Sequence, residues 1–225
     1  MSHLEPPDMK GDWNRRAREN AEHYIATHDD PSDATFRASG RRDVAAFFDG
    51  LDHLLSPQSR VLDIGSGIGR MDEFIAPRVM KLVGIDVSGE MVQKARARLA
   101  HLRNVEYVEG DGISLRPLPN QSFDLVWSHI VFQHVPRSVF LAYLPEVHRV
   151  LSRGGSFVFQ MPEAVPGAPI DPPHDDTFSM RFWREEEVRS ALESVGFRWI
   201  GCRRYPVETP VLNFNQLRLH AERPA

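Results

Sequence analysis

The fold is decided by the stretch VLDIGSGIG, which runs from Val61 to Gly69 and leads from apolar residues directly into three alternating glycines. Short apolar runs bounded by glycine are typical of buried strands, and glycine lets a backbone turn tightly and approach a ligand closely. The stretch therefore predicts a strand, a ligand-binding turn and the start of a helix. A turn that only connects the strand to the helix is the alternative.

Two phosphate-binding motifs are excluded at this turn. The dinucleotide pattern G-x-G-x-x-G needs a glycine at position 70, where Arg70 stands, and a phosphate loop needs Gly-Lys-Ser or Gly-Lys-Thr after its glycines. The sequence therefore predicts a ligand that is not held by its phosphates.

From Val61 onward, short apolar runs alternate with longer helical patterns, which is typical of parallel strands joined by crossover helices. Strands are expected at 60–64, 81–86, 105–109, 123–127 and 156–160, and helices at 71–76, 88–102, 137–151 and 184–195. Ser88 is placed as an N-cap, and Gly154 and Gly196 are placed where glycines end helices. Two prolines make 111–122 a loop.

The two ends of the chain depart from this alternation. Residues 197–205 and 211–220 flank a short connection and are predicted to form an antiparallel hairpin, which makes the sheet mixed. Before the first strand, 13–25 and 41–55 are predicted as helices, and the polar stretch 28–33 between them is predicted to cap and break the chain.

The composition fits one folded core with an appended segment. Of 225 residues, 41% are hydrophobic and 26% are charged, and the formal net charge is -4, which excludes a disordered chain and leaves no basic patch for nucleic acid. Cys202 is the single cysteine, so it fits a reducing compartment and excludes an intrachain disulfide. Without a secretory pattern or a bilayer-length apolar run, we expect a cytoplasmic protein with no membrane partner.

Carboxylates follow the next two predicted strands. Asp86 ends the strand after the turn, where a ribose with two free hydroxyls would lie, and its carboxylate can accept hydrogen bonds from both. Asp111 follows the third strand, so it reaches the same edge of the sheet and can accept from an exocyclic adenine amine. Asp63, inside the turn, has two roles open: contact with the ligand, or support of the loop's own amides.

These motifs, with Ser122–Trp127 in the fourth strand and Glu146–Gly155 before the fifth, resemble the class I S-adenosylmethionine-dependent methyltransferases over roughly residues 40 to 200. The resemblance is closest to the small-molecule group that includes the ubiquinone and menaquinone enzymes. It implies a Rossmann-like α/β fold: a seven-stranded mixed sheet with helices on both faces, a C-terminal antiparallel hairpin and an N-terminal helical lid. The cofactor-binding residues that it implies are Asp63, Gly65, Gly67, Gly69, Asp86, Val87, Met91, Asp111, Gly112 and Ser128.

The acceptor side of the site is expected after the fourth strand, from Ser128 to Val135. The Asn/Asp-Pro-Pro-aromatic motif of nucleic-acid methyltransferases is absent there, and the similar run at 171–174 follows the fifth strand instead. His129 and His134 are the candidate bases, which a hydroxyl or a protonated amine would need, although each could only bond a nearby carbonyl. Residues 132–134 are similar to the Phe-Glu-His segment of cyclopropane-forming methyltransferases, but glutamine replaces the acid.

Aromatic side chains are candidates for the walls of the acceptor pocket. Trp13, Tyr24 and Phe36 would come from the N-terminal segment, and Phe182 and Trp183 from the end of the long loop after the fifth strand. Each could instead anchor its segment to the core. The acidic cluster at 171–176 has the hard ligands of a magnesium site, but no acid follows the fourth strand, so we expect a solvated loop and no metal.

The sequence thus predicts an enzyme that transfers a methyl group from S-adenosylmethionine to an oxygen or nitrogen atom of a small, partly apolar metabolite. A lid segment at 1–55 and a core at 56–225 are expected, in a monomer or homodimer. The main alternative is a protein that binds S-adenosylmethionine or S-adenosylhomocysteine without methyl transfer, or that directs a cyclisation. A protein-methylating enzyme is the third. Because only three of the 27 basic residues are lysines, we expect a bacterial source.

Overall fold

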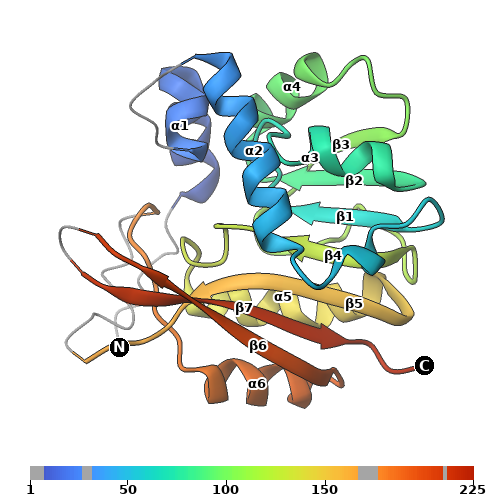
Figure 1. Ribbon diagram of the computed structural model, residues 1–225, viewed down its shortest axis with the longest axis vertical. Helices are drawn as coiled ribbons and strands as arrows, with labels where there is room; N and C mark the ends of the chain where they lie inside the picture. Colours follow the sequence, from blue (N-terminus) through green and yellow to red (C-terminus); the bar gives the residue numbers. More distant parts are fainter. Residues whose placement is uncertain (1–7, 27–31, 167–176, 210–211) are drawn as a thin grey trace. The chain divides into compact units, whose positions relative to one another are not determined.

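The computed structural model describes residues 8–26, 32–166, 177–209 and 212–225. Along the chain (Figure 1), the helices and strands are α1 (Met9–Ile25), α2 (Asp33–Phe47), η1 (Asp52–Leu54), β1 (Arg60–Ile64), α3 (Asp72–Ile75), η2 (Ala76–Arg78), β2 (Lys81–Asp86), α4 (Gly89–Arg98), β3 (Val105–Glu109), β4 (Phe123–Ser128), α5 (Arg137–Val150), β5 (Leu151–Pro162), α6 (Glu185–Ser194), β6 (Arg198–Val207) and β7 (Phe214–Glu222). In this part of the chain, no helix is both long and apolar enough to span a bilayer.

The strands form one seven-stranded sheet in the order β3-β2-β1-β4-β5-β7-β6. β1 pairs with β2, and β2 with β3, in parallel, whereas β7 pairs antiparallel with both β5 and β6. The predicted mixed sheet and its C-terminal hairpin are therefore confirmed. The apolar run at Val61–Ile64 is buried throughout, as expected for a strand covered on both faces.

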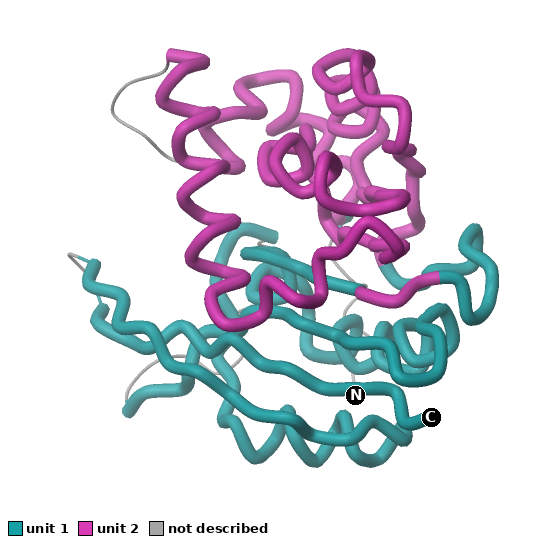
Figure 2. The backbone as a smooth tube through the Cα atoms, turned by 45° about the vertical axis from the view of Figure 1, so that its right-hand side comes forward, with its two compact units in different colours: residues 1–8, 113–122, 126–225 teal, residues 9–112, 123–125 magenta. Residues whose placement is uncertain are grey.

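The chain divides into two compact units, each described here by itself (Figure 2). Unit 2 comprises residues 9–112 and 123–125 and contains α1 to β3, with its core built around β1 and β2. Unit 1 comprises residues 1–8, 113–122 and 126–225. Its core holds stacked aromatic side chains: the rings of Phe157 and Phe159 lie 4.3 Å apart, and Phe132 meets Phe140 edge-on at 5.2 Å.

The helix predicted at 41–55 is misplaced. α2 begins eight residues earlier, because the side chain of Ser32 accepts a hydrogen bond from the Thr35 N–H and caps the helix. It ends at Phe47, and Gly50, with φ of +74°, lies in the turn that follows. The polar stretch at 28–33 was predicted to cap and break the chain, and Ser32 does cap α2. Residues 28–31 lie outside the described ranges.

Two other boundaries also differ from the prediction. α4 ends at Arg98, four residues before the predicted end. β5 begins at Leu151, directly after α5, so Gly154 lies inside a strand and does not end a helix. Its N–H donates to the carbonyl of Arg223 at 2.8 Å, which pairs this glycine with the C-terminal segment. Gly196, with φ of +96°, does follow α6 as predicted.

α1 is a kinked helix. Asn20 has φ of -168° and ψ of 89°, so the helical hydrogen bonding is interrupted there. The Asn20 side-chain oxygen accepts from the His23 N–H at 3.1 Å, as an N-cap does for a new helix. The helix thus consists of a longer segment before Asn20 and a short one that ends at Ile25.

Candidate active site

The glycine turn has the backbone that the sequence predicts. Gly65, Gly67 and Gly69 have φ of +77°, +54° and +75°, a region that side chains larger than hydrogen rarely adopt. The Gly65 N–H donates to the Ile85 carbonyl at 2.7 Å, which ties the loop to the end of β2. Glycine is therefore required here by conformation.

Asp86 lies where β2 ends and faces this loop. Its Oδ2 accepts from the Gly67 N–H at 2.9 Å, and its Oδ1 accepts from the Ser88 N–H at 2.8 Å. Burial raises the pKa of Asp86 to about 6, while these two N–H donors act to lower it. The group is therefore ionised at neutral pH, and each oxygen keeps a lone pair for a further donor.

The end of β3 lies next to the same segment. The Gly110 N–H donates to the Asp86 carbonyl at 2.8 Å, and a Cβ on Gly112 would lie 2.8 Å from a methyl group of Val87. Gly112 has φ of +80°, so glycine is needed there for both conformation and space. Asp111 is exposed at this edge. Asp86, Val87, Asp111 and Gly112 are thus brought together within unit 2.

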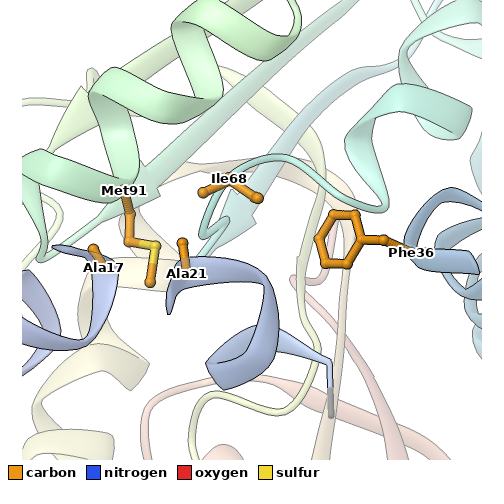
Figure 3. Packing of buried hydrophobic residues seen from close by; sticks show 5 residues of the cluster. All are labelled: Ala17, Ala21, Phe36, Ile68 and Met91. Carbon is orange, nitrogen blue, oxygen red and sulfur yellow. The ribbon is translucent and has the colours of Figure 1, made fainter. Parts of the chain in front are cut away.

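Met91 is covered by the N-terminal helix. In Figure 3 it extends from α4 towards Ala17 and Ala21 of α1, while Ile68 comes from the glycine loop and Phe36 from α2; these five residues form one buried cluster. Met91, predicted to contact the cofactor, therefore contacts α1.

Ile25, at the end of the same helix, lies over the glycine loop: its Cδ1 is 2.8 Å from the position that a Cβ on Gly67 would take. α1 thus covers both the start of α4 and the outer side of the loop.

Asn14 joins α1 to the N-terminus of α4, a role that the sequence analysis missed. Its Oδ1 accepts from the Ser88 hydroxyl at 2.8 Å and from the Glu90 N–H at 3.2 Å. Arg18, one helical turn further along α1, donates to Glu90 at 3.1 Å. No sequence signal marks an asparagine inside a helix as such a contact.

Arg70, which breaks the dinucleotide motif, anchors α2 to the loop. Its Nη1 donates to Asp43 Oδ2 at 2.6 Å and to the Ser39 hydroxyl at 2.9 Å. A Cβ on Gly40 would lie 2.5 Å from the Arg70 carbonyl oxygen, so α2 packs directly against this backbone. The arginine thus has a structural reason to stand where a dinucleotide site would need glycine.

Asp63 is 4% exposed, and its pKa is raised first by this burial and then by the nearby carboxyl of Asp72. Asp72 is held by Tyr107, whose hydroxyl donates to its Oδ2 at 2.9 Å. Of the two roles left open for Asp63, its burial favours support of the loop. Asp72 and Tyr107 were missed, although a charged residue among the apolar positions of 71–76 was a signal.

The N-terminal aromatic residues differ in burial. Phe36 is 2% exposed and belongs to the core of unit 2, which favours anchoring over a wall of the acceptor pocket. Trp13 is partly buried under the Arg16 guanidinium, 4.9 Å from its ring. The Tyr24 hydroxyl donates to Glu19 at 3.0 Å.

His134 lies in unit 1 with both ring nitrogens engaged. Nδ1 is 2.7 Å from the Phe178 carbonyl oxygen, and Nε2 is 3.0 Å from Gln133 Nε2. Because the carbonyl only accepts, Nδ1 carries the hydrogen and Nε2 accepts from the amide. The ring also stacks on Phe178. This arrangement favours a structural role for His134 over a catalytic one.

The residues at the C-terminal end of β4 differ from one another in burial. Ser128 is buried, and His129 is half-buried where the strand stops. Ile130, which the sequence analysis did not single out, has φ of +57° and is exposed. A β-branched residue in this region is strained, and such strain is concentrated at functional sites.

Phe182 and Trp183 are core residues of unit 1. The Phe182 ring meets Phe214 edge-on at 5.5 Å, and Trp183 packs between Phe140 and the Arg137 guanidinium, which is 3.7 Å from its ring centre. Both side chains therefore anchor the segment before α6, which favours the anchoring role. The acidic cluster at 171–176 lies outside the described residues. Within the described ranges, no group of three or more His, Cys, Asp or Glu side chains could hold a metal ion.

Comparison with known proteins shows a similarity to methyltransferases. Residues 62–159 match the family model described as a methyltransferase domain. Trans-aconitate 2-methyltransferase from Paracidovorax citrulli is 34% identical over 111 residues, which cover 48% of this chain and 41% of that protein. The chain spans about half the length, or less, of the first curated relatives that it matches.

Solved structures agree on the fold. The [4+2]-cyclase SpnF superposes with a TM-score of 0.74 at 18% identity, over 98% of this chain and 97% of that one. The 1,6-didemethyltoxoflavin-N1-methyltransferase of Burkholderia thailandensis, solved with its acceptor and S-adenosylhomocysteine, has a TM-score of 0.69 at 20% identity, over 100% of this chain and 93% of that one. Residues 62–159 are therefore similar to methyltransferase domains, and the chain shares the fold of these solved structures. The predicted resemblance is confirmed.

Proposed function

We propose that this chain transfers the methyl group of S-adenosylmethionine to an oxygen atom of a small organic acid. The observation that carries the proposal is the left-handed glycine loop held by Asp86, a cradle that suits an adenosine without phosphates. Asp86 would accept from the ribose hydroxyls and Asp111 from the adenine amine. Bound there, S-adenosylmethionine supplies a methyl group on a cationic sulfur.

The choice of acceptor is supported by a relative and by the histidines. The relative from Paracidovorax citrulli is named for its action on trans-aconitate, an acid. A carboxylate reaches the site already deprotonated, so the protein has to align it and exclude water, and no base is needed. This agrees with His134, whose ring nitrogens are both engaged. His129 remains the candidate base for an acceptor that must lose a proton.

The N-terminal segment, residues 1–55, would act as a lid on the core. This role is supported by the contact of Ile25 with Gly67 and by the kink at Asn20, where a short segment could turn away from the loop. We also infer a cytoplasmic location, since Cys202 stands alone in the chain, and action as a monomer or homodimer on a small molecule.

A second candidate function is cofactor binding without methyl transfer. It is favoured by the similarity in fold to the [4+2]-cyclase SpnF, which covers almost the whole of both chains. In that case the loop and Asp86 would bind the cofactor, and the rest of the site would direct another reaction.

Methyl transfer is tested by incubating the purified full chain with S-adenosylmethionine that carries a labelled methyl group and a panel of small organic acids, including trans-aconitate, beside matched alcohols and amines. We expect a labelled methyl ester from one of the acids. Labelled product from the amines alone would assign nitrogen as the acceptor. Binding of S-adenosylhomocysteine without labelled product would favour the second candidate.

A further inference from the structure

A pocket lined by other residues than those proposed for the cofactor lies within unit 2. It has a volume of about 410 Å³ and is lined by residues 17–22 of α1, by Ile68 of the glycine loop and by Lys94, Ala97 and Arg98 of α4. This volume is within the range of small-molecule sites. A molecule bound in this pocket would therefore be a second ligand, in addition to the cofactor.

Two charged side chains of the pocket, Glu22 and Lys94, differ from the others in their bonding. The other charged side chains that line it are held in the ion pairs Arg18–Glu90 at 3.1 Å, Arg15–Glu19 at 3.5 Å and Arg98–Glu73 at 3.2 Å. In the described part of the chain, neither the Glu22 carboxylate nor the Lys94 ammonium group forms a hydrogen bond or an ion pair. Glu22 is half-buried on α1 and Lys94 is exposed on α4. A ligand with one positive and one negative group would complement both.

The remaining lining of the pocket is mostly apolar. Ala17, Ala21 and Ile68 are 1%, 7% and 5% exposed and belong to the buried cluster drawn in Figure 3. Ala97 adds a methyl group from α4. Aliphatic carbon atoms bound on this surface would be removed from water, which is favourable. The two charges and the apolar wall together match an amino acid with an aliphatic side chain.

The pocket also lies at the kink of α1. Asn20, where the helix is interrupted, is one of its lining residues, and Glu22 belongs to the short segment that follows. Ile25 ends that segment and lies over Gly67 of the glycine loop. A ligand that pairs with Glu22 and with Lys94 of α4 therefore links the short segment to α4 and keeps Ile25 over the loop.

We propose that this pocket binds an amino acid with an aliphatic side chain, whose ammonium group pairs with Glu22 and whose carboxylate pairs with Lys94. The bound amino acid holds residues 21–25 against the glycine loop and so strengthens cofactor binding. It acts as an effector, and no covalent bond is formed or broken. The binding site is inferred from the pocket alone, whereas its effect on the cofactor rests on the proposed function.

Binding is tested by calorimetry on the full chain with L-alanine, L-leucine and L-methionine. Two analogues of leucine are matched probes: 4-methylpentanoate lacks the ammonium group, and 3-methylbutylamine lacks the carboxylate. We expect leucine to bind, and each analogue to bind at least about fivefold more weakly, because each loses one charged interaction. The site is overturned if none of the three amino acids binds at millimolar concentration, or if an analogue binds as tightly as leucine.

Two variants assign the charges. Lys94→Gln should weaken the binding of leucine and of 4-methylpentanoate by about fivefold and leave 3-methylbutylamine unaffected, while Glu22→Gln should weaken leucine and the amine only. Lys81→Gln is the control, since Lys81 pairs with Glu106 and does not line the pocket; it should bind all three probes as the wild type does. Equal weakening of all three probes in both variants would contradict the assignment.

The effect on the cofactor is measured as the affinity for S-adenosylhomocysteine with and without saturating leucine. We expect affinity to rise by about fivefold in the wild type. Lys94→Gln should lack this rise and should keep its affinity in the absence of leucine within about twofold of the wild type. An unchanged affinity in the wild type would overturn the effector role.

S-adenosylhomocysteine itself carries an ammonium group and a carboxylate, so competition must be tested as well. If leucine displaces S-adenosylhomocysteine, the amino acid occupies the cofactor site and the second site is overturned. If leucine follows the expected charge pattern while S-adenosylhomocysteine does not bind at all, the proposed cofactor site is wrong and the amino acid site stands.

Discussion

At the scale of single residues, Asp86 combines two opposed effects. Burial disfavours its charge and raises its pKa, while the N–H groups of Gly67 and Ser88 favour the charge. The carboxylate thus organises the loop and the start of α4 before any ligand arrives. Binding a diol then adds donors to a group that is already oriented, so little ordering is needed.

Asp86→Ala should weaken the binding of S-adenosylhomocysteine by about 1.5–3 kcal/mol, because charge-assisted hydrogen bonds to the ribose are lost. Calorimetry on the purified protein measures this change. Asp86→Asn is the control: its amide oxygen can still accept one hydrogen bond, so its loss should be smaller. Unchanged affinity in Asp86→Ala would contradict the ribose assignment.

The pKa of about 6 for Asp86 predicts a second effect, on the acid side. Ribose hydroxyls donate to the ionised carboxylate, so the ligand favours the deprotonated form and its binding releases a proton when Asp86 is protonated. Affinity should therefore be full above about pH 7 and fall as the pH drops below 6. Asp86→Asn should lack this acid-side fall; a fall of equal size in the variant would assign it to another group.

At the scale of helices and strands, the N-terminus of α4 is the point where the N-terminal segment is attached. The Ser88 hydroxyl accepts from the Met91 N–H at 3.1 Å as the helix N-cap, and donates to Asn14 of α1. One hydroxyl thus caps the first turn of α4 and also binds α1, so the helix cap and the attachment of α1 depend on the same atom.

Ser88→Ala should lower the free energy of unfolding by about 1–2 kcal/mol through loss of the cap, with an added loss from the contact with Asn14. Asn14→Ala should cost less alone, since the cap is kept. Denaturant unfolding of both single variants and the double variant measures the coupling. Strictly additive effects would show that the Ser88–Asn14 hydrogen bond does not stabilise the protein.

Elements differ in how far their sequence predicts them. β1, β2 and β3 were predicted with their observed bounds. A short apolar run bounded by glycine, proline or polar residues is typical of a buried strand, and those bounding residues mark where the strand begins and ends. α2 was not, because its start depends on a single capping contact at Ser32 inside a polar stretch. The same limit applies to the site: Gly67 and Asp86 follow from motif position, whereas the hydrogen bond from Tyr107 to Asp72 depends on β3 and α3 meeting in the fold.

At the scale of the whole molecule, the residues proposed for the reaction are divided between the two compact units. The residues proposed for the cofactor from Asp63 to Gly112 belong to unit 2, whereas Ser128 and His129 belong to unit 1. Binding of S-adenosylhomocysteine tests the proposed cofactor residues, and methyl transfer tests the proposed reaction. A variant that changes turnover without changing cofactor affinity separates the two.

His129→Gln is the variant that makes this separation. With a carboxylate acceptor, turnover should stay within about fivefold of the wild type, because no proton has to be removed and glutamine keeps some hydrogen bonding. Cofactor affinity should be unchanged. Steady-state kinetics over pH, on the acceptor found in the labelling experiment, measures both. A loss of about 10²–10⁴ in turnover, together with loss of an acidic limb near the histidine pKa of about 6.5, would instead make His129 a general base and the acceptor a hydroxyl or an amine.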